Sequence, residues 1–480
     1  MKASEIMKSI KTYDAFPDTD ISFITADSRK VCDGCIFVCI RGNSFDGHDA
    51  AQKALADGAV FVVCERDLGL ENQVVVSNTR AAFSVMCSNF FGNPSQKLKI
   101  IGITGTNGKT TTTFLMKNML EKLGCKTGLI GTVKNMVGDK EYPAAFTTPE
   151  SFELHSLFAQ MVDEGCKYCV MEVSSQALAQ ERVTGVEFAA GVFTNLTQDH
   201  LDYHGTFENY AQAKSRLFEH SELCVLNLDD EHAMSMLRNS DGRMVTYSID
   251  ENEADYKAEY IRYKTDGIEY ELVTTGYVER VKVGIPGEFT VYNSMAAAVT
   301  LIELGFDFSK VLYALSLSEG VKGRIEVVPT DTDYTVIIDY AHSPDGLENI
   351  ISSLRKIAKN RIITVFGCGG DRDKTKRPIM GAIAAKLSDV IVVTSDNPRS
   401  ENPDAIINDI LEGIKGAKVK KIVEPDRTKA IKAALDEACE DDIVLLAGKG
   451  HETYQILNTG KIHYDEREIV KGLLDGTLKG

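Results

Sequence analysis

Residues 98–124 read LKIIGITGTNGKTTTTFLMKNMLEKLG. The apolar run 98–104 predicts a buried strand, and the segment from residue 109 predicts a helix that ends at Gly124. The helix should bury one face, formed by Phe114, Leu115, Met119, Leu120 and Leu123. A strand, a glycine-rich turn and a helix in this order are typical of an α/β unit that binds phosphate at the helix N-terminus.

The turn supplies the chemistry of phosphate binding. Its glycines allow main-chain N–H groups to surround a phosphate, Lys109 can neutralise the β- and γ-phosphates, and the Thr110 hydroxyl can bind Mg²⁺. The turn departs from the strict GxxxxGK[ST] spacing, because Ile103 stands where the first glycine would be. We predict that the ATP-binding residues of this turn are Gly105, Thr106, Asn107, Gly108, Lys109, Thr110 and Thr111.

Further along, two predicted strands end in groups that suit a cation site. Glu172 closes the strand YCVMEV, and the strand AAGVFTN leads into the cluster TNLTQDHLDYHG at residues 194–205, which contains His200. Carboxylate, amide and hydroxyl oxygens are the ligands that Mg²⁺ prefers. The following helix carries Lys214, which from its spacing alone is a solvated lysine.

The last third of the chain repeats the alternation of strands and helices. Its strands are YTVIIDY, RIITVFG, DVIVVTS, VKKIVEP and DIVLLAG, with helices predicted at 345–358, 402–416 and 427–439. Three strand ends carry charged groups: GCGGDRDK contains Arg372, SDNPRSE contains residues 395–401, and GKGHE begins at Gly448. Two arginines, an Asp/Asn pair and Glu452 at one sheet edge would suit a zwitterion with carboxylates and an amine.

Length and composition set the outline of the molecule. A chain of 480 residues predicts about three domains, and the fold class that we expect is α/β. We predict a small N-terminal α/β module (1–97), a central doubly wound sheet like that of P-loop ATPases (98–323) and a C-terminal Rossmann-like doubly wound sheet (324–480). Residues 244–285 are more polar and predict β-hairpins. Scattered cysteines, including Cys39, Cys64, Cys169 and Cys224, predict buried thiols.

The charge balance argues against two classes of protein. The 53 Lys and Arg against 70 Asp and Glu give a net charge of −17, which disfavours a general nucleic-acid or anionic-membrane binder. Apolar runs long enough for a membrane span or a signal peptide are missing from the sequence. We therefore expect a cytoplasmic protein that does not bind nucleic acid, does not insert into a membrane and is a monomer.

Taken together, these segments resemble the Mur ligases, the ATP-dependent amide-bond ligases of peptidoglycan precursor synthesis. The resemblance rests on GTNGKTTT, EVSSQAL, TNLTQDHLDYHGTFENYAQAK, YAHSPDGLEN, GCGGDRDK, DNPR and GKGHE, with ADSRKVCDG near the N-terminus. It implies that meso-2,6-diaminopimelate is joined to UDP-N-acetylmuramoyl-L-alanyl-D-glutamate through an acyl phosphate, with ATP and Mg²⁺. The tetrad DNPR is the sign usually linked to diaminopimelate.

The resemblance also implies roles for individual residues. Lys109, His200 and Lys214 would be catalytic, and Lys214 would be carbamylated, which reverses the interpretation from spacing. Metal ligands would be Thr110, Glu172, His200 and the Lys214 carbamate, and Asn293 and Arg324 would add to the ATP site. The UDP-substrate would contact the 42–45 turn, Ser28, Thr147, Thr148, Ser174, Gln180 and Arg182. Diaminopimelate would contact Arg372, Asp396, Asn397, Pro398, Arg399, Gly448 and Glu452.

Three alternatives stay open at this point. The nearest is the lysine-adding ligase of the same family, and a more distant one is a folylpolyglutamate synthase. A nucleotide-dependent switch or motor ATPase would explain the phosphate-binding turn, but it would leave Arg372, Arg399 and Glu452 without a role.

Overall fold

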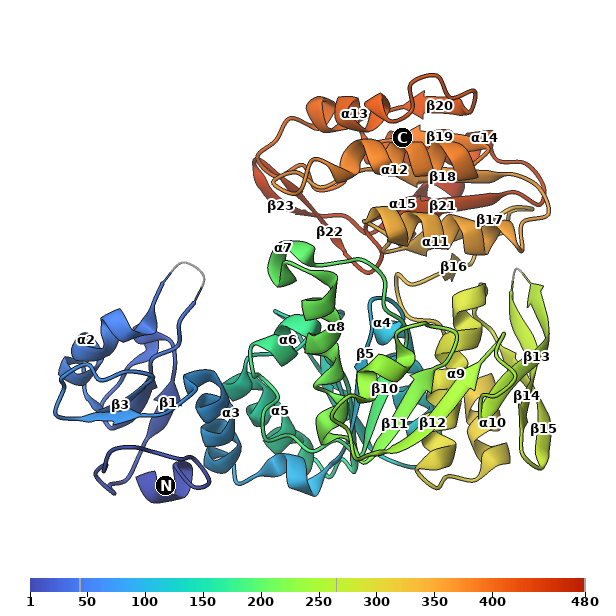
Figure 1. Cartoon of the computed structure of the whole chain (residues 1–480). Helices are drawn as coiled ribbons and strands as arrows, with labels where there is room; N and C mark the ends of the chain where they lie inside the picture. The colour runs from blue at the N-terminus through green and yellow to red at the C-terminus, as the bar shows by residue number, and fades with distance from the viewer. Residues whose placement is uncertain (43–44, 265, 479–480) are drawn as a thin grey trace. The chain divides into compact units, whose positions relative to one another are not determined.

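The computed structural model describes residues 1–42, 45–264 and 266–478. The chain forms two compact units, Met1–Lys257 with Ala296–Ala314 and Ala258–Met295 with Leu315–Gly480. Figure 1 shows strands and helices alternating along most of the chain. The predicted domain limits at residues 97/98 and 323/324 stay predictions.

The N-terminal part is a small α/β module, as predicted. Its sheet is parallel and has the order β1-β2-β3-β4, and apolar clusters lie on both of its faces. The strands are β1 (Phe23–Thr25), β2 (Cys35–Val38), β3 (Ala59–Cys64) and β4 (Gln73–Val75), and the helices are α1 (Ala3–Ile6), α2 (Ala51–Ala56) and α3 (Thr79–Phe90). Cys39 and Cys64 are buried thiols, as are Cys169 and Cys224 further along the chain.

The second sheet has eleven strands in the order β15-β14-β13-β12-β11-β10-β5-β9-β6-β7-β8. Its parallel strands include β5 (Lys99–Thr104), β6 (Thr127–Ile130), β9 (Tyr168–Glu172), β10 (Ala190–Phe193), β11 (Leu223–Asn227) and β12 (Arg243–Ser248). Strand β5 lies between β10 and β9, so their carboxyl ends meet at one edge. The strands β7 (Asn135–Val137) and β8 (Lys140–Tyr142) extend the sheet antiparallel.

The helices of this region are α4 (Lys109–Lys122), α5 (Ser151–Asp163), α6 (Ser175–Ala179), α7 (Leu201–His204), α8 (Phe207–Ser215), α9 (Glu288–Glu303) and α10 (Phe308–Ser316). The predicted apolar face of α4 is only partly right. Leu115, Met119 and Leu120 are buried, but Phe114 and Leu123 are half-exposed and Met116 is buried instead. The buried face of α4 therefore lies closer to Met116 than the prediction placed it.

The stretch 244–285 forms hairpin structure only in its later part. Strands β14 (Gly267–Thr274) and β15 (Tyr277–Val283) pair antiparallel, whereas β12 and the start of β13 (Tyr256–Lys264) pair parallel. Strand β12 is buried over residues 245–248 and continues the parallel sheet from β11, which is why the hairpin prediction is wrong for that strand.

The C-terminal sheet has the order β16-β17-β21-β18-β19-β20. Strands β17 (Thr335–Asp339), β18 (Ile362–Phe366), β19 (Val390–Val393), β20 (Lys420–Val423) and β21 (Ile443–Ala447) are parallel, and β16 (Glu326–Val328) pairs antiparallel with β17. The five predicted strands and three predicted helices of this region are present, although each helix ends two to four residues before its predicted limit.

Helices cover both faces of the C-terminal sheet. One apolar cluster joins α11 (Pro344–Arg355), α12 (Lys376–Leu387) and α13 (Pro403–Glu412) to it, and another joins α14 (Arg427–Glu437) and α15 (Glu466–Leu474) (Figure 1). A two-stranded hairpin, β22 (Tyr454–Leu457) and β23 (Gly460–His463), follows β21 in the chain. Because the parallel strands end at one edge, the segments that follow β18, β19 and β21 lie near one another.

Candidate functional site

The turn that the sequence analysis predicts to bind phosphate, called the phosphate-binding turn below, joins the end of β5 to the start of α4, as predicted. Gly105 has a φ of 149°, and a Cβ at this position would lie 1.9 Å from Thr194 Oγ1, so only glycine fits. The loop after β10 holds the turn. Asn195 accepts from Asn107 N through its side chain (2.9 Å) and from Thr106 N through its carbonyl oxygen (2.8 Å). The turn is thus fixed from a neighbouring strand end.

Two lysines converge on the carbonyl oxygen of Gly105. Lys109 Nζ donates to it at 2.7 Å and to Thr106 O at 2.9 Å, and Lys214 Nζ donates to it at 2.8 Å. Lys214 lies on α8, with its Nζ 4.7 Å from the centre of the Tyr210 ring. The structure therefore places Lys214 beside the phosphate-binding turn.

Lys214 is almost completely buried, so the interpretation of it as a solvated lysine is wrong. Burial lowers the pKa of Lys214 far below that of a free lysine, and the nearby charge of Lys109 lowers it further. A lowered pKa favours the neutral amine, which is the form that reacts with electrophiles such as CO₂.

Glu172 is the centre of a buried group of oxygens beside the turn. Its carboxylate accepts from Thr110 Oγ1 at 2.9 Å, from Thr132 N at 2.8 Å and from Thr132 Oγ1 at 3.1 Å. Thr132 was missed by the sequence analysis, although it follows the apolar strand β6 as Glu172 ends β9. Two hydroxyls and a carboxylate within hydrogen-bonding distance are hard ligands of the kind that Mg²⁺ uses.

His200 has side-chain contacts with Asp199 and Tyr210 but, within the described residues, no hydrogen bond or ion pair with Glu172 or Thr110. It has a φ of 52°, its Nε2 lies 3.6 Å from Asp199 Oδ2, and its ring lies 6.3 Å from that of Tyr210. Among residues 1–42, 45–264 and 266–478, no three Asp, Glu, His or Cys side chains form a cluster that could hold a metal ion. Of the predicted metal ligands, the structure brings only Thr110 and Glu172 into direct contact.

Most of the residues predicted to contact the UDP-substrate form one connected chain. Thr148 Oγ1 donates to Glu172 O at 2.9 Å and accepts from Ser174 N at 3.0 Å, and Arg182 Nη1 donates to Thr148 O at 2.8 Å. Gln180 accepts from Arg182 at 2.8 Å. This chain starts at the main-chain carbonyl of Glu172 and ends at the buried guanidinium of Arg182.

The other predicted substrate and ATP residues lie on separate elements. Thr147 shares a hydrogen bond of 3.0 Å with Thr132, and Ser28 begins a short 3-10 turn. Asn293 lies on α9. Arg324 stacks 4.9 Å from the centre of the Tyr340 ring, and its Nε is buried and makes no hydrogen bond within the described part of the chain. Residues 43 and 44 of the predicted 42–45 turn lie outside the described residues.

In the C-terminal unit, the structure brings together the predicted residues Asp396, Asn397, Arg399 and Glu452, but within the described residues no hydrogen bond or ion pair joins Arg372 to them. Asn397, beyond β19, donates from Nδ2 to Glu452 Oε2, beyond β21, at 2.9 Å. Gly448 is the first residue after β21, and a Cβ there would lie 3.0 Å from Asp396 Oδ2. Pro398 O accepts from Glu401 N at 3.0 Å. The ends of two strands that do not pair with each other thus carry one polar cluster.

Of the two predicted arginines, Arg399 contacts this cluster and Arg372 hydrogen-bonds its own chain neighbour. Arg399 has a φ of 52°, and its Nη1 donates to Gly370 O at 2.8 Å and to Asn397 O at 3.4 Å. Arg372 is exposed and donates to Asp371 O at 3.2 Å. A Cβ at Gly369 would lie 2.9 Å from Arg399 Nη1, so the glycine makes room for that guanidinium.

Lys449 is a third cation, for which the sequence analysis gave no role. It is fully buried, and its Nζ lies 3.2 Å from Glu452 Oε2, 3.2 Å from Asn397 Oδ1 and 3.5 Å from Asp396 Oδ1. Its sequence position between Gly448 and Gly450, three residues before an acid, was the available signal. Lys449 binds the side chains of both strand ends into one network.

Comparisons with known proteins agree with this geometry. Residues 20–86 match the Mur ligase family catalytic domain, residues 103–301 the Mur ligase middle domain and residues 323–450 the Mur ligase glutamate ligase domain. A curated relative from Clostridium acetobutylicum, named UDP-N-acetylmuramoyl-L-alanyl-D-glutamate–2,6-diaminopimelate ligase 1, is 49% identical and the match covers 94% of each chain. A relative of that name, without the number, from Clostridium perfringens is 47% identical over 96% of each chain.

A solved structure extends the likeness to three dimensions. It is a UDP-N-acetylmuramoyl-L-alanyl-D-glutamate–2,6-diaminopimelate ligase with a TM-score of 0.74 and 32% identity, covering 100% of both chains. These matches agree with the α/β architecture described above. The chain therefore belongs to the Mur ligases, a family of ATP-dependent amide-bond ligases with a three-domain fold.

Proposed function

We propose that the protein joins meso-2,6-diaminopimelate to UDP-N-acetylmuramoyl-L-alanyl-D-glutamate, converting ATP to ADP and phosphate. The names of relatives up to 49% identical support this reaction. The observation that carries the proposal is the polar cluster of the C-terminal unit, where Arg399 adjoins the contact between Asn397 and Glu452. The cluster offers a guanidinium, which suits the carboxylates of a dicarboxylic diamine, and the carboxylates of Asp396 and Glu452, which suit its amines.

We assign the ATP phosphates to Gly105–Thr111, with Asn293 and Arg324 as further ATP contacts. The turn offers main-chain N–H groups and the start of a fourteen-residue helix, both of which favour an anion. Lys109 already folds back over the turn, 2.7 Å from Gly105 O, so its charge would lie beside the phosphates. Alignment and charge neutralisation are the main requirements of phosphoryl transfer.

The residues beside the turn fit Mg²⁺. Thr110 and Glu172 supply oxygen ligands, and His200 and a carbamate on Lys214 would complete the set. When bound, Mg²⁺ would neutralise charge on the phosphates and on the group being transferred. Carbamylation adds CO₂ to the neutral Lys214 amine with loss of one proton. The burial that lowers the pKa of Lys214 favours this reaction, because it leaves the nitrogen lone pair free.

We place the UDP-substrate along Ser28, Thr147, Thr148, Ser174, Gln180 and Arg182. Arg182 is 8% exposed and pairs with Glu150 at 2.7 Å, and its guanidinium lies 5.0 Å from the centre of the Phe146 ring. ATP would phosphorylate the free carboxylate of the D-glutamyl group. An amine of diaminopimelate would then attack the acyl phosphate, and phosphate would leave as the amide forms.

We assign the added amino acid to Arg372, Asp396, Asn397, Pro398, Arg399, Gly448 and Glu452. The guanidinium of Arg399 would pair with the carboxylate that lysine lacks. Arg399 is half-buried. With lysine bound, its guanidinium would have no carboxylate partner, and the cost of removing it from water would not be recovered, so the site should bind lysine more weakly. This reasoning favours diaminopimelate over the lysine-adding alternative.

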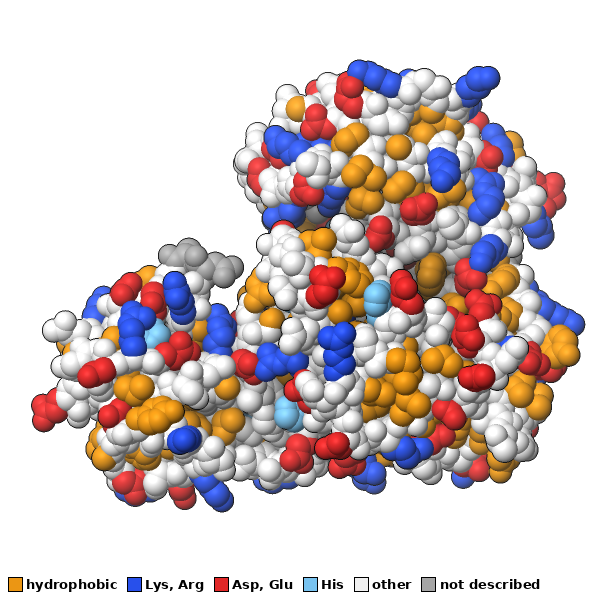
Figure 2. All heavy atoms as spheres, in the orientation of Figure 1, with side chains coloured by type: hydrophobic (Ala, Val, Ile, Leu, Met, Phe, Trp, Pro, Cys, Tyr) orange, Lys and Arg blue, Asp and Glu red, His pale blue; other side chains and the backbone are white. Residues whose placement is uncertain are grey.

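The reaction would take place in the cytoplasm on a monomeric enzyme. In the part of the chain that the structure describes, every helix is too short or too polar to cross a bilayer. Basic and acidic side chains are interspersed over the visible face in Figure 2, in keeping with substrates held by local groups.

A competition between the two amino acids tests the proposal. The enzyme is given ATP, the UDP-dipeptide and equal concentrations of meso-diaminopimelate and L-lysine, and the products are separated by mass. We expect the diaminopimelate product to dominate and its excess to fall in Arg399→Met. Arg355→Met is the matched control, because Arg355 binds Leu387 O and Asp389 on the same unit. A dominant lysine product would contradict the substrate assignment.

A further inference from the structure

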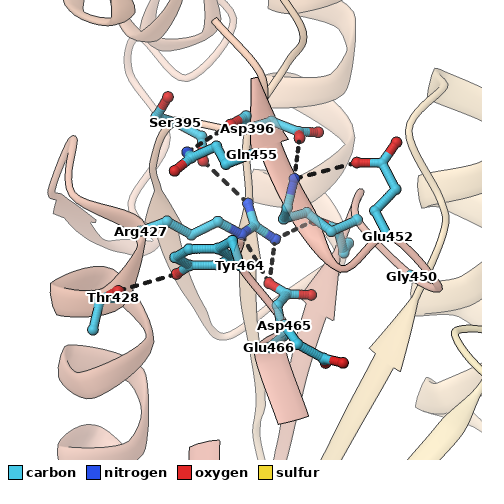
Figure 3. Close-up of polar contacts among 12 residues, drawn as sticks. Ser395, Asp396, Arg427, Thr428, Gly450, Glu452, Gln455, Tyr464, Asp465 and Glu466 are labelled. Atoms are coloured by element: carbon cyan, nitrogen blue, oxygen red, sulfur yellow. Dashed lines mark hydrogen bonds and ion pairs between the residues drawn. The ribbon is translucent and has the colours of Figure 1, made fainter. Parts of the chain in front are cut away.

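Arg427, at the start of α14, is a fully buried arginine with no assigned role in the reaction. Figure 3 shows its guanidinium between the segments that follow two strands of the C-terminal sheet. Nη2 donates to Ala447 O at 2.9 Å, and Nη1 donates to Ser395 O at 3.3 Å. One planar group therefore binds two main-chain carbonyls.

These carbonyls stand directly before residues of the proposed amino-acid site. Ala447 ends β21 and precedes Gly448, and Ser395 lies beyond β19 and precedes Asp396. Strand β18 separates β19 from β21 in the sheet, so the ladder hydrogen bonds do not join the two strand ends directly. The guanidinium makes that connection.

The surroundings hold the guanidinium in one place. Glu466, at the start of α15, accepts from Arg427 Nε at 2.8 Å, and both side chains are fully buried. Gln455 adds a second connection, since its Nε2 donates to Asp396 O at 2.7 Å. Arg427 binds main-chain groups, whereas Lys449 binds the side chains of Asp396, Asn397 and Glu452.

We propose that Arg427 is a positioning residue for the added amino acid: it sets the spacing between the Asp396–Asn397 segment and the Gly448–Glu452 segment. This inference rests on the proposed function of that site. Arg427 acts through the two carbonyls, since its donors are directed to them and to Glu466. A shift of about 1 Å between the two segments would misplace the ligands of a rigid dicarboxylic diamine.

A purely structural role would leave a different signature. A buried ion pair contributes little net stability, and replacing both partners by apolar residues of similar volume is often neutral or stabilising. The double variant Arg427→Met/Glu466→Leu should therefore fold, but the two strand ends would lose their connection. A structural role changes the amount of folded protein, whereas a positioning role changes one substrate's KM.

The test measures KM for diaminopimelate, ATP and the UDP-dipeptide, together with the thermal midpoint. In the double variant we expect KM for diaminopimelate to rise about tenfold or more, as for loss of a charged hydrogen bond, and the other two KM values to change less than about twofold. Glu466→Gln keeps both carbonyl contacts and should retain a diaminopimelate KM near that of the unmodified enzyme.

The matched control lies at the opposite edge of the same sheet, where an arginine joins the starts of β18 and β21. Arg361 precedes β18 and pairs with Asp442, which precedes β21, at 2.7 Å. Arg361→Met should lower the thermal midpoint and leave all three KM values unchanged. Arg427→Lys is a second probe, because it keeps a charge opposite Glu466 and loses the planar contact with two carbonyls. It should raise the diaminopimelate KM as the double variant does.

Several results would overturn the proposal. They are an unchanged diaminopimelate KM in a folded double variant, an equal rise in all three KM values, or failure of Arg427→Lys to fold where Arg361→Met folds. If the unmodified enzyme ligated no diaminopimelate, the proposed function would fail instead, and the two failures are thus distinguishable.

Discussion

Two buried lysines, Lys214 and Lys449, stand in opposite electrostatic surroundings. Lys214 donates to the neutral carbonyl of Gly105, and the charge of Lys109 lowers its pKa below the value that burial alone would give. Lys449 lies between the carboxylates of Asp396 and Glu452, with Asn397 as a third partner. Burial alone therefore does not define what a lysine does; its neighbours do.

This difference in surroundings suggests a chemical role for Lys214 and a structural role for Lys449. A lysine held near another cation favours the neutral amine, which suits carbamylation, while a lysine between two acids neutralises them and fixes their positions. The same residue type would thus prepare a metal ligand beside the phosphate-binding turn and organise the amino-acid site in the other unit.

The largest expected effect is on turnover. Lys214→Ala should reduce kcat by about 10²–10³, because it removes a group that stabilises charge at the transferred phosphoryl. High bicarbonate should not restore the rate, since the variant has no amine to carbamylate. Phosphate release with all substrates present measures this. A variant with a near-normal rate would show that the carbamate has no role.

The second effect contrasts the stabilities of the two sites. Lys449→Met should lower the free energy of unfolding by about 3–5 kcal/mol, because the buried carboxylate of Asp396 and the partly buried carboxylate of Glu452 lose their counter-ion. Lys214→Met should be neutral or stabilising, since Lys109 still donates to Gly105 O. Denaturant unfolding of both variants makes the comparison. Equal losses would remove the distinction between the two lysines.

A smaller effect concerns the affinity for one substrate. Arg399→Ala should raise KM for diaminopimelate by about 10- to 100-fold, as expected for loss of a charged hydrogen bond, and raise KM for ATP much less. Steady-state kinetics with each substrate varied in turn would show the split. Equal increases in both KM values would count against a direct contact.

The smallest effect is a pH dependence of stability. The pKa of Lys214 is lowered by folding, so the unfolded chain binds a proton that the folded chain does not, over a window below the unfolded value of about 10.5. As pH falls through this window, the unmodified protein should lose stability relative to Lys214→Met by about 1.4 kcal/mol per pH unit. The free energy of unfolding of both proteins is measured in CO₂-free buffers between pH 8 and 10, which lie below the unfolded pKa of ~10.5. Parallel pH profiles would contradict the lowered pKa.

Local patterns were enough for much of the fold and of the site. The strand, turn and helix around Gly105 and the strand ends at Glu172 and Asp396 follow from apolar runs and glycines, so the sequence analysis found them. The spacing of residues along α8 predicted that Lys214 is solvated, and the resemblance to a known family replaced that interpretation. The buried Nζ of Lys214 donates to Gly105 O, which lies 109 residues away in the sequence.

Other features depend on contacts that no local pattern indicates. Arg427 meets Glu466 across 39 residues, and the role of Lys449 depends on acids from two strand ends. Strand β12 pairs parallel with β11, although the polar sequence around it predicted a hairpin. The roles of Arg427 and Lys449 were therefore missed because they depend on partners that are distant in the sequence.

The most direct test of ligase activity follows phosphate release from ATP under three conditions: ATP alone, ATP with the UDP-dipeptide, and ATP with both the UDP-dipeptide and meso-diaminopimelate. Sustained release should require both co-substrates, and each phosphate released should be matched by one new amide bond. Comparable release from ATP alone would contradict the ligase mechanism and favour a nucleotide-dependent switch.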